Sequence, residues 1–289
     1  TGGLMTLYNM AVIKEPGKVE FQRKELRDPQ PDEVLIKVHS AAICGSDLHL
    51  FKGKHPSVKL PSAVGHELSG VVSQIGNDVT GIQVGDRVTV EPIIACGHCY
   101  FCQRGAYHLC VNINFQYRIG QGAFTEYFYA PQHHVFRLPD SISFEEGALI
   151  EPLSVALHAV KKSGISVCQT SAVIGGGAIG LLVSMVLNNL TGSKPFLSDI
   201  NDFRVQKAVD LGAIGVFPRR GEDLEKKVMQ HTDGLGVEYA FEAVGLEATL
   251  IQALQIIRKS GKVTLLGIFE EQTPKIPINL FVQREISLS

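Results

Sequence analysis

Residues 171–190 read "SAVIGGGAIGLLVSMVLNNL", an apolar strand followed by a glycine turn and an apolar helix. Gly175, Gly177 and Gly180 form the pattern G-x-G-x-x-G at the start of the expected helix. The first glycine permits a tight turn, the second lets a pyrophosphate approach the backbone, and the third lets the helix pack on the strand. The stretch therefore predicts a dinucleotide-binding turn, with Ile179 as a further candidate contact.

Asp199 ends the next expected strand, at about the 20-residue spacing at which an acidic residue binds the ribose hydroxyls of a dinucleotide. A carboxylate there would repel a 2′-phosphate, which favours NAD over NADP. Arg204 lies close enough in sequence to weaken that preference.

Outward from this turn, strands and helices alternate through the C-terminal half. Short apolar strands with helical connections imply a doubly wound parallel sheet. One connection, residues 247–261, is expected to be a helix. Gly245 and Gly267 end two of the strands, where ligands of such sheets gather, and are predicted to let the backbone approach the cofactor. The expected strands are "SAVI", "KPFLSDI", "AIGVF", "GVEYAFEAVG", "KVTLLGIF" and "EISLS".

The N-terminal half has a different pattern. From residue 8 to about 140, short segments rich in β-branched and aromatic residues are bounded by Gly, Pro, Asn and Asp. This pattern predicts a mostly antiparallel β lobe. Residues 144–163 then suit a single helix, ended by Gly164.

Composition excludes several classes of protein. The chain has 289 residues, a net charge of −2 and no basic block, so nothing indicates nucleic acid or a membrane surface. No run approaches the roughly 18 apolar residues of a membrane span, and no signal peptide is visible. We therefore expect a cytoplasmic protein.

Four of the six cysteines, Cys96, Cys99, Cys102 and Cys110, lie within "CGHCYFCQRGAYHLC". Cysteines this close along the chain pair poorly as disulfides, and an iron–sulfur cluster would lack a second cysteine group. Four thiolates suit a tetrahedral zinc ion and leave no open position, so a structural zinc is predicted.

A second metal would need other ligands. Cys44 in "ICGSDLH" and His66 in "VGHELSG", with Glu67 beside it, are the candidates, because reactive zinc takes three protein ligands and keeps one position open. Spacing alone leaves open the alternatives of a packed cysteine and a satisfied buried histidine.

The motifs "CGSDLH", "GHELSG", "VGDRV", the four-cysteine loop, "ALIEPLSVALHA" and G-x-G-x-x-G occur in the order found in medium-chain zinc alcohol dehydrogenases. The chain resembles the sorbitol (polyol) dehydrogenase branch, with 2,3-butanediol dehydrogenases close beside it. This resemblance implies a GroES-like catalytic domain over residues 5–153 and a Rossmann NAD-binding domain over 154–289. Relatives continue with a segment that returns to the first domain, and this segment is expected to be missing here.

The resemblance also implies roles for individual residues. Cys44 and His66 would ligate the catalytic zinc, with Glu67 as the third ligand and Glu151 as an alternating or water-linked one. Ser46 would take the proton of the alcohol and His49 would pass it on. The implied reaction is hydride transfer from a secondary alcohol, a polyol or vicinal diol, to NAD, in a homotetramer or homodimer.

Other functions stay open at this point. Threonine 3-dehydrogenases are a sister branch, although they tend to carry His where this chain has Pro92. A protein that binds NAD and zinc as a redox sensor without turnover, and a zinc-independent reductase of the same fold, are further alternatives. The intact Cys44, His66, Glu67 and Ser46 argue against both.

Overall fold

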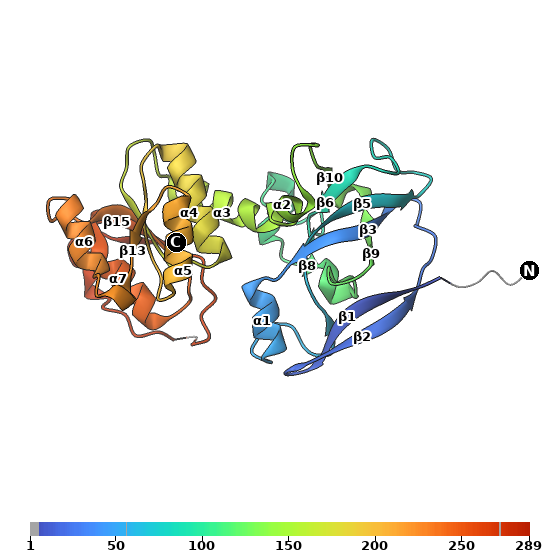
Figure 1. Cartoon of the computed structure of the whole chain (residues 1–289), viewed down its shortest axis with the longest axis horizontal. Helices are drawn as coiled ribbons and strands as arrows, with labels where there is room; N and C mark the ends of the chain where they lie inside the picture. Colours follow the sequence, from blue (N-terminus) through green and yellow to red (C-terminus); the bar gives the residue numbers. More distant parts are fainter. Residues whose placement is uncertain (1–5, 56, 272) are drawn as a thin grey trace, which may run out of the picture. The chain divides into compact units, whose positions relative to one another are not determined.

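The computed structural model describes residues 6–55, 57–271 and 273–289. Met5, the first residue of the predicted catalytic domain, lies outside them. The chain forms two compact units, residues 1–151 and 152–289 (Figure 1).

The first unit is built of antiparallel strands, in agreement with the sequence. A five-stranded sheet has the order β10-β6-β5-β3-β9, a three-stranded sheet the order β2-β1-β4, and β7 pairs with β8. The strands are β1 (Leu7–Glu15), β2 (Lys18–Glu25), β3 (Glu33–Ala42), β4 (Ser62–Ala63), β5 (Glu67–Ile75), β6 (Arg87–Val90), β7 (Ile93–Ile94), β8 (Asn114–Phe115), β9 (Tyr127–Pro131) and β10 (Val135–Arg137).

Strand β3 joins two hydrophobic cores of this unit, because successive side chains of a strand point to opposite faces. Val34 and Ile36 pack in a cluster with Phe128 of β9, while Leu35 packs in another with Met10 of β1. Helices are short here: α1 (Gly45–Phe51), α2 (Phe144–Ala148), and the 3₁₀ turns η1 (Cys102–Arg104), η2 (Tyr107–Leu109), η3 (Gln116–Ile119) and η4 (Gln132–His134).

The single helix predicted over 144–163 is wrong, because it is broken in two. Helix α2 is capped at Leu149, and α3 (Ile150–Ser163) begins immediately after. Pro152 explains the break, since proline lacks an N–H and its ring clashes with the carbonyl four residues earlier, that of Ala148. Proline is tolerated only in the first turn of a new helix.

The second unit is a parallel sheet of six strands in the order β13-β12-β11-β14-β15-β16, which confirms the doubly wound prediction. Its strands are β11 (Ser171–Ile174), β12 (Phe196–Ser198), β13 (Ile214–Val216), β14 (Val237–Glu242), β15 (Ile257–Leu265) and β16 (Ser287–Leu288). Its remaining helices are α4 (Ala178–Thr191), α5 (Asp202–Asp210), η5 (Pro218–Arg220), α6 (Leu224–His231), α7 (Glu247–Ile256) and α8 (Asn279–Arg284).

Helices cover both faces of this sheet. Ala172 and Ile174 of β11 pack with α6 and α7, whereas Val173 between them packs with α3, α4 and α5. Helix α7 is shorter than expected, because the chain turns into β15 at Ile257, which is fully buried and pairs with Val237. Pairing with β14 outweighs the local helical pattern there.

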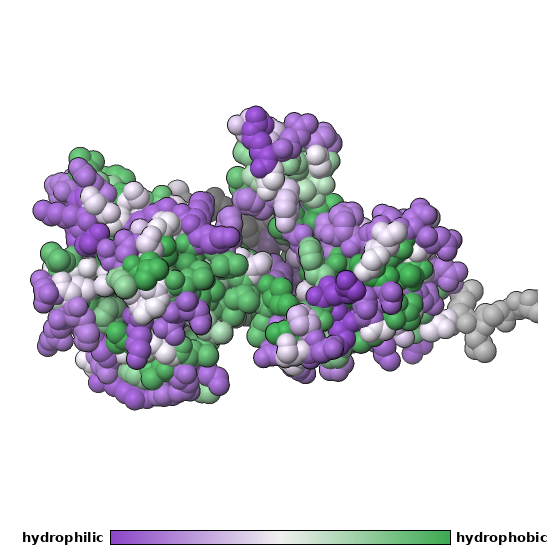
Figure 2. All heavy atoms as spheres, turned by 90° about the horizontal axis from the view of Figure 1, so that it is seen from above, coloured by the Kyte–Doolittle hydropathy of each residue, from purple (hydrophilic) through white to green (hydrophobic). Residues whose placement is uncertain are grey.

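No helix in the described part of the chain combines the length and apolarity that crossing a membrane requires. Polar and apolar residues are mixed on the surface of both units (Figure 2).

Candidate functional site

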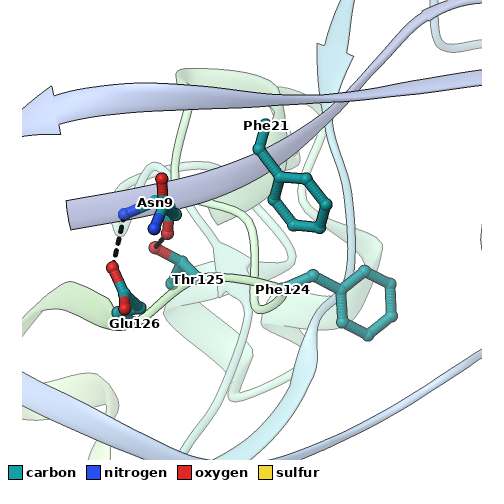
Figure 3. Close-up of a pocket in the computed structure, with 5 residues that line it drawn as sticks. All are labelled: Asn9, Phe21, Phe124, Thr125 and Glu126. Atoms are coloured by element: carbon teal, nitrogen blue, oxygen red, sulfur yellow. Dashed lines mark hydrogen bonds between the residues drawn. The ribbon is translucent and has the colours of Figure 1, made fainter.

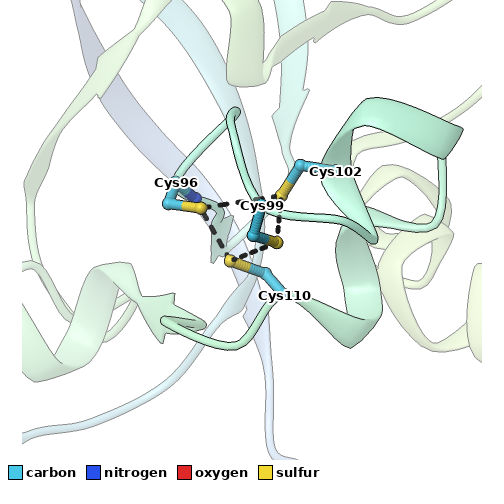
Figure 4. A group of neighbouring side chains, drawn as sticks. All are labelled: Cys96, Cys99, Cys102 and Cys110. Atoms are coloured by element: carbon cyan, nitrogen blue, oxygen red, sulfur yellow. Dashed lines mark hydrogen bonds between the residues drawn. The ribbon is translucent and has the colours of Figure 1, made fainter.

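The four clustered cysteines converge on one point (Figure 4). The Sγ–Sγ distances are 3.5 Å for Cys99–Cys102, 3.9 Å for Cys96–Cys102 and 4.0 Å for Cys99–Cys110. A zinc ion with four Zn–S bonds of about 2.3 Å needs sulfurs about 3.8 Å apart. The cluster therefore fits a tetrahedral zinc.

Backbone amides support this cluster. The amides of Cys96 and Asn112 donate to the Cys110 sulfur, at 3.3 and 3.4 Å. Such hydrogen bonds favour the thiolate and lower the pKa of Cys110. Amides likewise lower the pKa of Cys99 to about 6, so the loop holds two of its four sulfurs ready to bind a cation.

The second group of metal-ligating side chains consists of Cys44, His66 and Glu67, whose ligand atoms all lie within 4.8 Å of one another. Cys44 precedes helix α1, His66 lies in the loop before β5, and Glu67 is the first residue of β5. The folded chain thus joins two motifs that lie 22 residues apart in the sequence.

The donor set fits a zinc ion in chemistry as well as in geometry, because zinc binds thiolate, imidazole and carboxylate. Nδ1 of His66 is buried without a hydrogen-bond partner. Burial raises the pKa of Cys44 to about 11 and also raises that of Glu67, because it disfavours the charged forms. A divalent cation bound there would reverse both shifts.

Asp47 holds this site together, and the sequence analysis missed it. Its side chain is 8% exposed and accepts hydrogen bonds from the amides of Cys44 (2.9 Å) and Gly65 (3.1 Å). Its carboxylate also lies 3.8 Å from Nδ1 of His66. The available signal was an acidic residue at the third position of a helix, where it can cap the helix start.

Other predicted residues lie around this group. Glu151, in the first turn of α3, is not among the atoms that converge within 4.8 Å, and burial raises its pKa to about 7. Ser46 and His49 both lie on α1. Residues three apart on a helix share a face, so these two side chains are neighbours.

The glycine turn has the local geometry that the motif predicts. Gly175 has φ of +102°, a conformation that side chains rarely adopt, and a Cβ on Gly180 would lie 1.8 Å from the Gly175 carbonyl oxygen. Gly177 caps α4 and has open space around it, and Ile179 lies in the first turn of that helix. The helix N-terminus and the open backbone at Gly177 suit a phosphate.

Asp199 lies directly against this turn. Its two carboxylate oxygens accept the amides of Gly176 and Asn201, both at 2.7 Å. Arg204 lies 3.5 Å from the same carboxylate, as close as the sequence suggested.

Gly245 and Gly267 pack against each other, since a Cβ on Gly267 would lie 2.1 Å from the Gly245 amide nitrogen. The absence of a side chain at both glycines is therefore needed for this close backbone contact. The fully buried Glu242, also missed from the sequence, organises the loop by accepting the amides of Val244 and Gly245 and the hydroxyl of Thr249, at 2.8–3.1 Å. An acidic residue at the end of an apolar strand was the signal available.

Comparison with known proteins decides the family. Residues 30–140 match the model of the alcohol dehydrogenase GroES-like domain, and residues 178–289 match that of the zinc-binding dehydrogenases. A sorbitol dehydrogenase of Bacillus subtilis is 34% identical over 274 residues, which cover 93% of this chain and 77% of the relative. The chain belongs to the zinc-dependent medium-chain alcohol dehydrogenases.

Two more members of this dehydrogenase family show its range. An L-threonine 3-dehydrogenase of Pyrococcus horikoshii is 38% identical over 266 residues, covering 90% of this chain and 76% of the relative. The crystal structure of 2R,3R-butanediol dehydrogenase from Bacillus subtilis superposes with a TM-score of 0.86 at 36% identity, covering 98% of this chain and 83% of that one. The protein is therefore a zinc- and nicotinamide-dinucleotide-dependent oxidoreductase.

One cavity of this dehydrogenase lies apart from both groups of candidate metal ligands. A cavity of about 480 Å³ on the first unit is lined by Asn9, Phe21, Phe124, Thr125 and Glu126 (Figure 3). The carboxylate of Glu126 accepts a hydrogen bond from the backbone amide of Asn9 at 2.6 Å. No residue of either cysteine-containing group is among the residues that line the cavity.

Proposed function

We propose that this dehydrogenase oxidises a secondary alcohol of a polyol or vicinal diol to a ketone, with NAD as the hydride acceptor. The convergence of Cys44, His66 and Glu67 carries the proposal, because it is a three-ligand set of the kind that leaves a zinc position open. The similarity to sorbitol and butanediol dehydrogenases supports the substrate class.

In this proposal Cys44, His66 and Glu67 hold the catalytic zinc, and Glu151 serves as a second carboxylate that can replace Glu67. Cys96, Cys99, Cys102 and Cys110 hold a structural zinc. A zinc ion at the first site would supply Lewis acidity to a substrate hydroxyl, and NAD would accept the hydride.

The chain's own residues would move the proton. The Ser46 hydroxyl takes it from the substrate, and the His49 imidazole, on the same face of α1, passes it to solvent. The partly exposed position of both side chains supports such a path.

The dinucleotide would bind at Gly175, Gly177, Ile179 and Gly180, with Asp199 on the ribose. The nearly buried carboxylate of Asp199, whose side chain is 6% exposed, disfavours a 2′-phosphate and supports NAD over NADP. We further propose residues 5–153 as the catalytic domain and 154–289 as the nucleotide domain, a cytoplasmic location and a homo-oligomer.

Zinc counting and a substrate panel test this function. Mass spectrometry should find two zinc ions per chain, and NADH absorbance should rise with polyols or vicinal diols. Cys44→Ser should remove one zinc and the turnover, whereas Cys168→Ser, a change at an exposed cysteine outside both groups, should remove neither.

Two other results would contradict the proposal. Oxidation of L-threonine alone would favour the threonine 3-dehydrogenase assignment, which the 38% identity to such an enzyme supports. Binding of NAD and two zinc ions without turnover of any alcohol would favour a redox sensor.

A further inference from the structure

A cationic cavity lies beside the candidate catalytic zinc site. It has a volume of about 380 Å³, and Ser57, Lys59, Tyr117 and Arg118 are among its lining residues; we call these four the cationic subsite. All four belong to the first unit.

Tyr117 connects the cationic subsite to the metal ligands. Its ring centroid lies 5.7 Å from that of His66, so a single aromatic ring separates the cavity from a zinc ligand. Tyr117 is itself half-buried and forms part of the cavity wall.

Arg118 is held in place by its neighbours. Its guanidinium donates to Ser57 Oγ at 2.8 Å and lies 5.2 Å from the centroid of the Phe115 ring and 5.9 Å from that of Tyr117. Such contacts orient the planar group while leaving most of its five N–H donors available.

Among the residues that the structure describes, the two cations of the subsite have no anionic partner. Within the described ranges of the chain, neither Lys59 nor Arg118 forms a salt bridge with a carboxylate. An arginine with spare donors beside a lysine is the arrangement that binds carboxylate or phosphate groups.

We infer that the cationic subsite binds an anionic group at the far end of the alcohol substrate. The preferred substrates are then hydroxy acids derived from sugars or sugar-alcohol phosphates, which carry a carboxylate or a phosphate, rather than uncharged polyols. This inference rests on the proposed function, because it places the anion next to the zinc site of that reaction.

The test compares a neutral hexitol, the corresponding hexonate and the hexitol 6-phosphate as substrates of the zinc- and NAD-loaded chain. One of the two anions should show a kcat/KM at least about tenfold above that of the neutral hexitol, the usual strength of a charge-assisted contact. Arg118→Ala should remove that advantage through KM, and Arg118→Lys should restore part of it. The control is Arg23→Ala, at an exposed arginine of β2.

Calorimetric binding of the same anions distinguishes this inference from the proposed function. If no alcohol is oxidised, weaker anion binding by Arg118→Ala still supports the subsite while the reaction fails. The subsite is wrong if the wild type does not prefer either anion in turnover or in binding, or if Arg118→Ala changes neutral and anionic ligands equally.

Discussion

The carboxylate of Asp47 accepts the backbone amide of Gly65 at 3.1 Å, across 18 residues of sequence. Its other oxygen accepts the amide of Cys44 at 2.9 Å. One buried side chain therefore fixes the start of helix α1 to the loop that presents His66.

Asp47→Asn should weaken this link, because an amide NH₂ replaces one of two oxygens that both face N–H donors. We expect the free energy of unfolding to fall by about 1–3 kcal/mol. Zinc content after dialysis should approach one ion per chain, since the four-cysteine site is untouched. Asp86→Asn is the control, because Asp86 accepts the Gln83 amide in an exposed turn and its change should alter neither quantity. Full retention of two zinc ions by Asp47→Asn would contradict this role.

Gly180→Ala and Gly177→Ala should differ sharply. A Cβ at 180 would lie 1.8 Å from the Gly175 carbonyl oxygen, so helix α4 must move away from β11. We expect a loss of roughly 2 kcal/mol or more in urea unfolding, in the range of overpacked cores. Gly177 has open space and a φ of −68°, so its replacement should cost under about 1 kcal/mol. Equal losses for both variants would refute the packing role of Gly180.

Glu242→Gln should loosen the loop that follows β14. The buried Oε1 accepts the amides of Val244 and Gly245 and the hydroxyl of Thr249, and Oε2 also accepts the Gly245 amide at 3.1 Å. In glutamine the remaining oxygen is uncharged and accepts more weakly, and an NH₂ in place of Oε2 would face the Gly245 N–H donor. We expect NADH, titrated by its fluorescence, to bind about tenfold more weakly, with zinc content unchanged. The matched control is Glu247→Gln, because Glu247 accepts the Lys275 amide at an exposed position. An unchanged dissociation constant for NADH in Glu242→Gln would show that this loop does not contribute to cofactor binding.

His134 should make the protein less stable in acid. Burial, with a smaller contribution from His133, lowers the pKa of His134 to about 4, below its ordinary value of 6.5. Between these values the unfolded chain binds a proton that the folded chain excludes, so stability falls as the pH falls, by up to about 3 kcal/mol. Urea unfolding at pH 4 to 7 should show this slope, and His134→Gln should reduce it. A slope that persists in the variant would assign the effect to other groups.

The doubly wound parallel sheet of the second unit and the antiparallel first unit could be predicted because they depend on local patterns. Glycine at turns and apolar runs of strand length are visible in the sequence. The break at Leu149 was also visible in principle, since Pro152 cannot continue a helix from Ala148. The early end of α7 was not, because only pairing with Val237 draws Ile257 into a strand.

The two convergent groups of candidate metal ligands could be predicted from the sequence, but the residues that support them could not. Asp47 and Glu242 act through backbone amides, and amides leave no signature in sequence. The sequence also does not distinguish His134, which is 8% exposed, from the adjacent and exposed His133, because the strand that pairs beside His134 is distant along the chain.

The pairing of β11 with β14 also has a consequence for biosynthesis. Ile174 is paired in register with Glu242, and Gly175 packs on Val244, so the glycine turn lacks its neighbour until almost seventy further residues have been translated. Long-range parallel pairing is slow, because the intervening chain must first be closed into a loop. The first unit has by then left the ribosome as far as residue 151. On a translating ribosome, the cysteine-bearing loops should acquire their ions well before the nascent chain can recognise a dinucleotide.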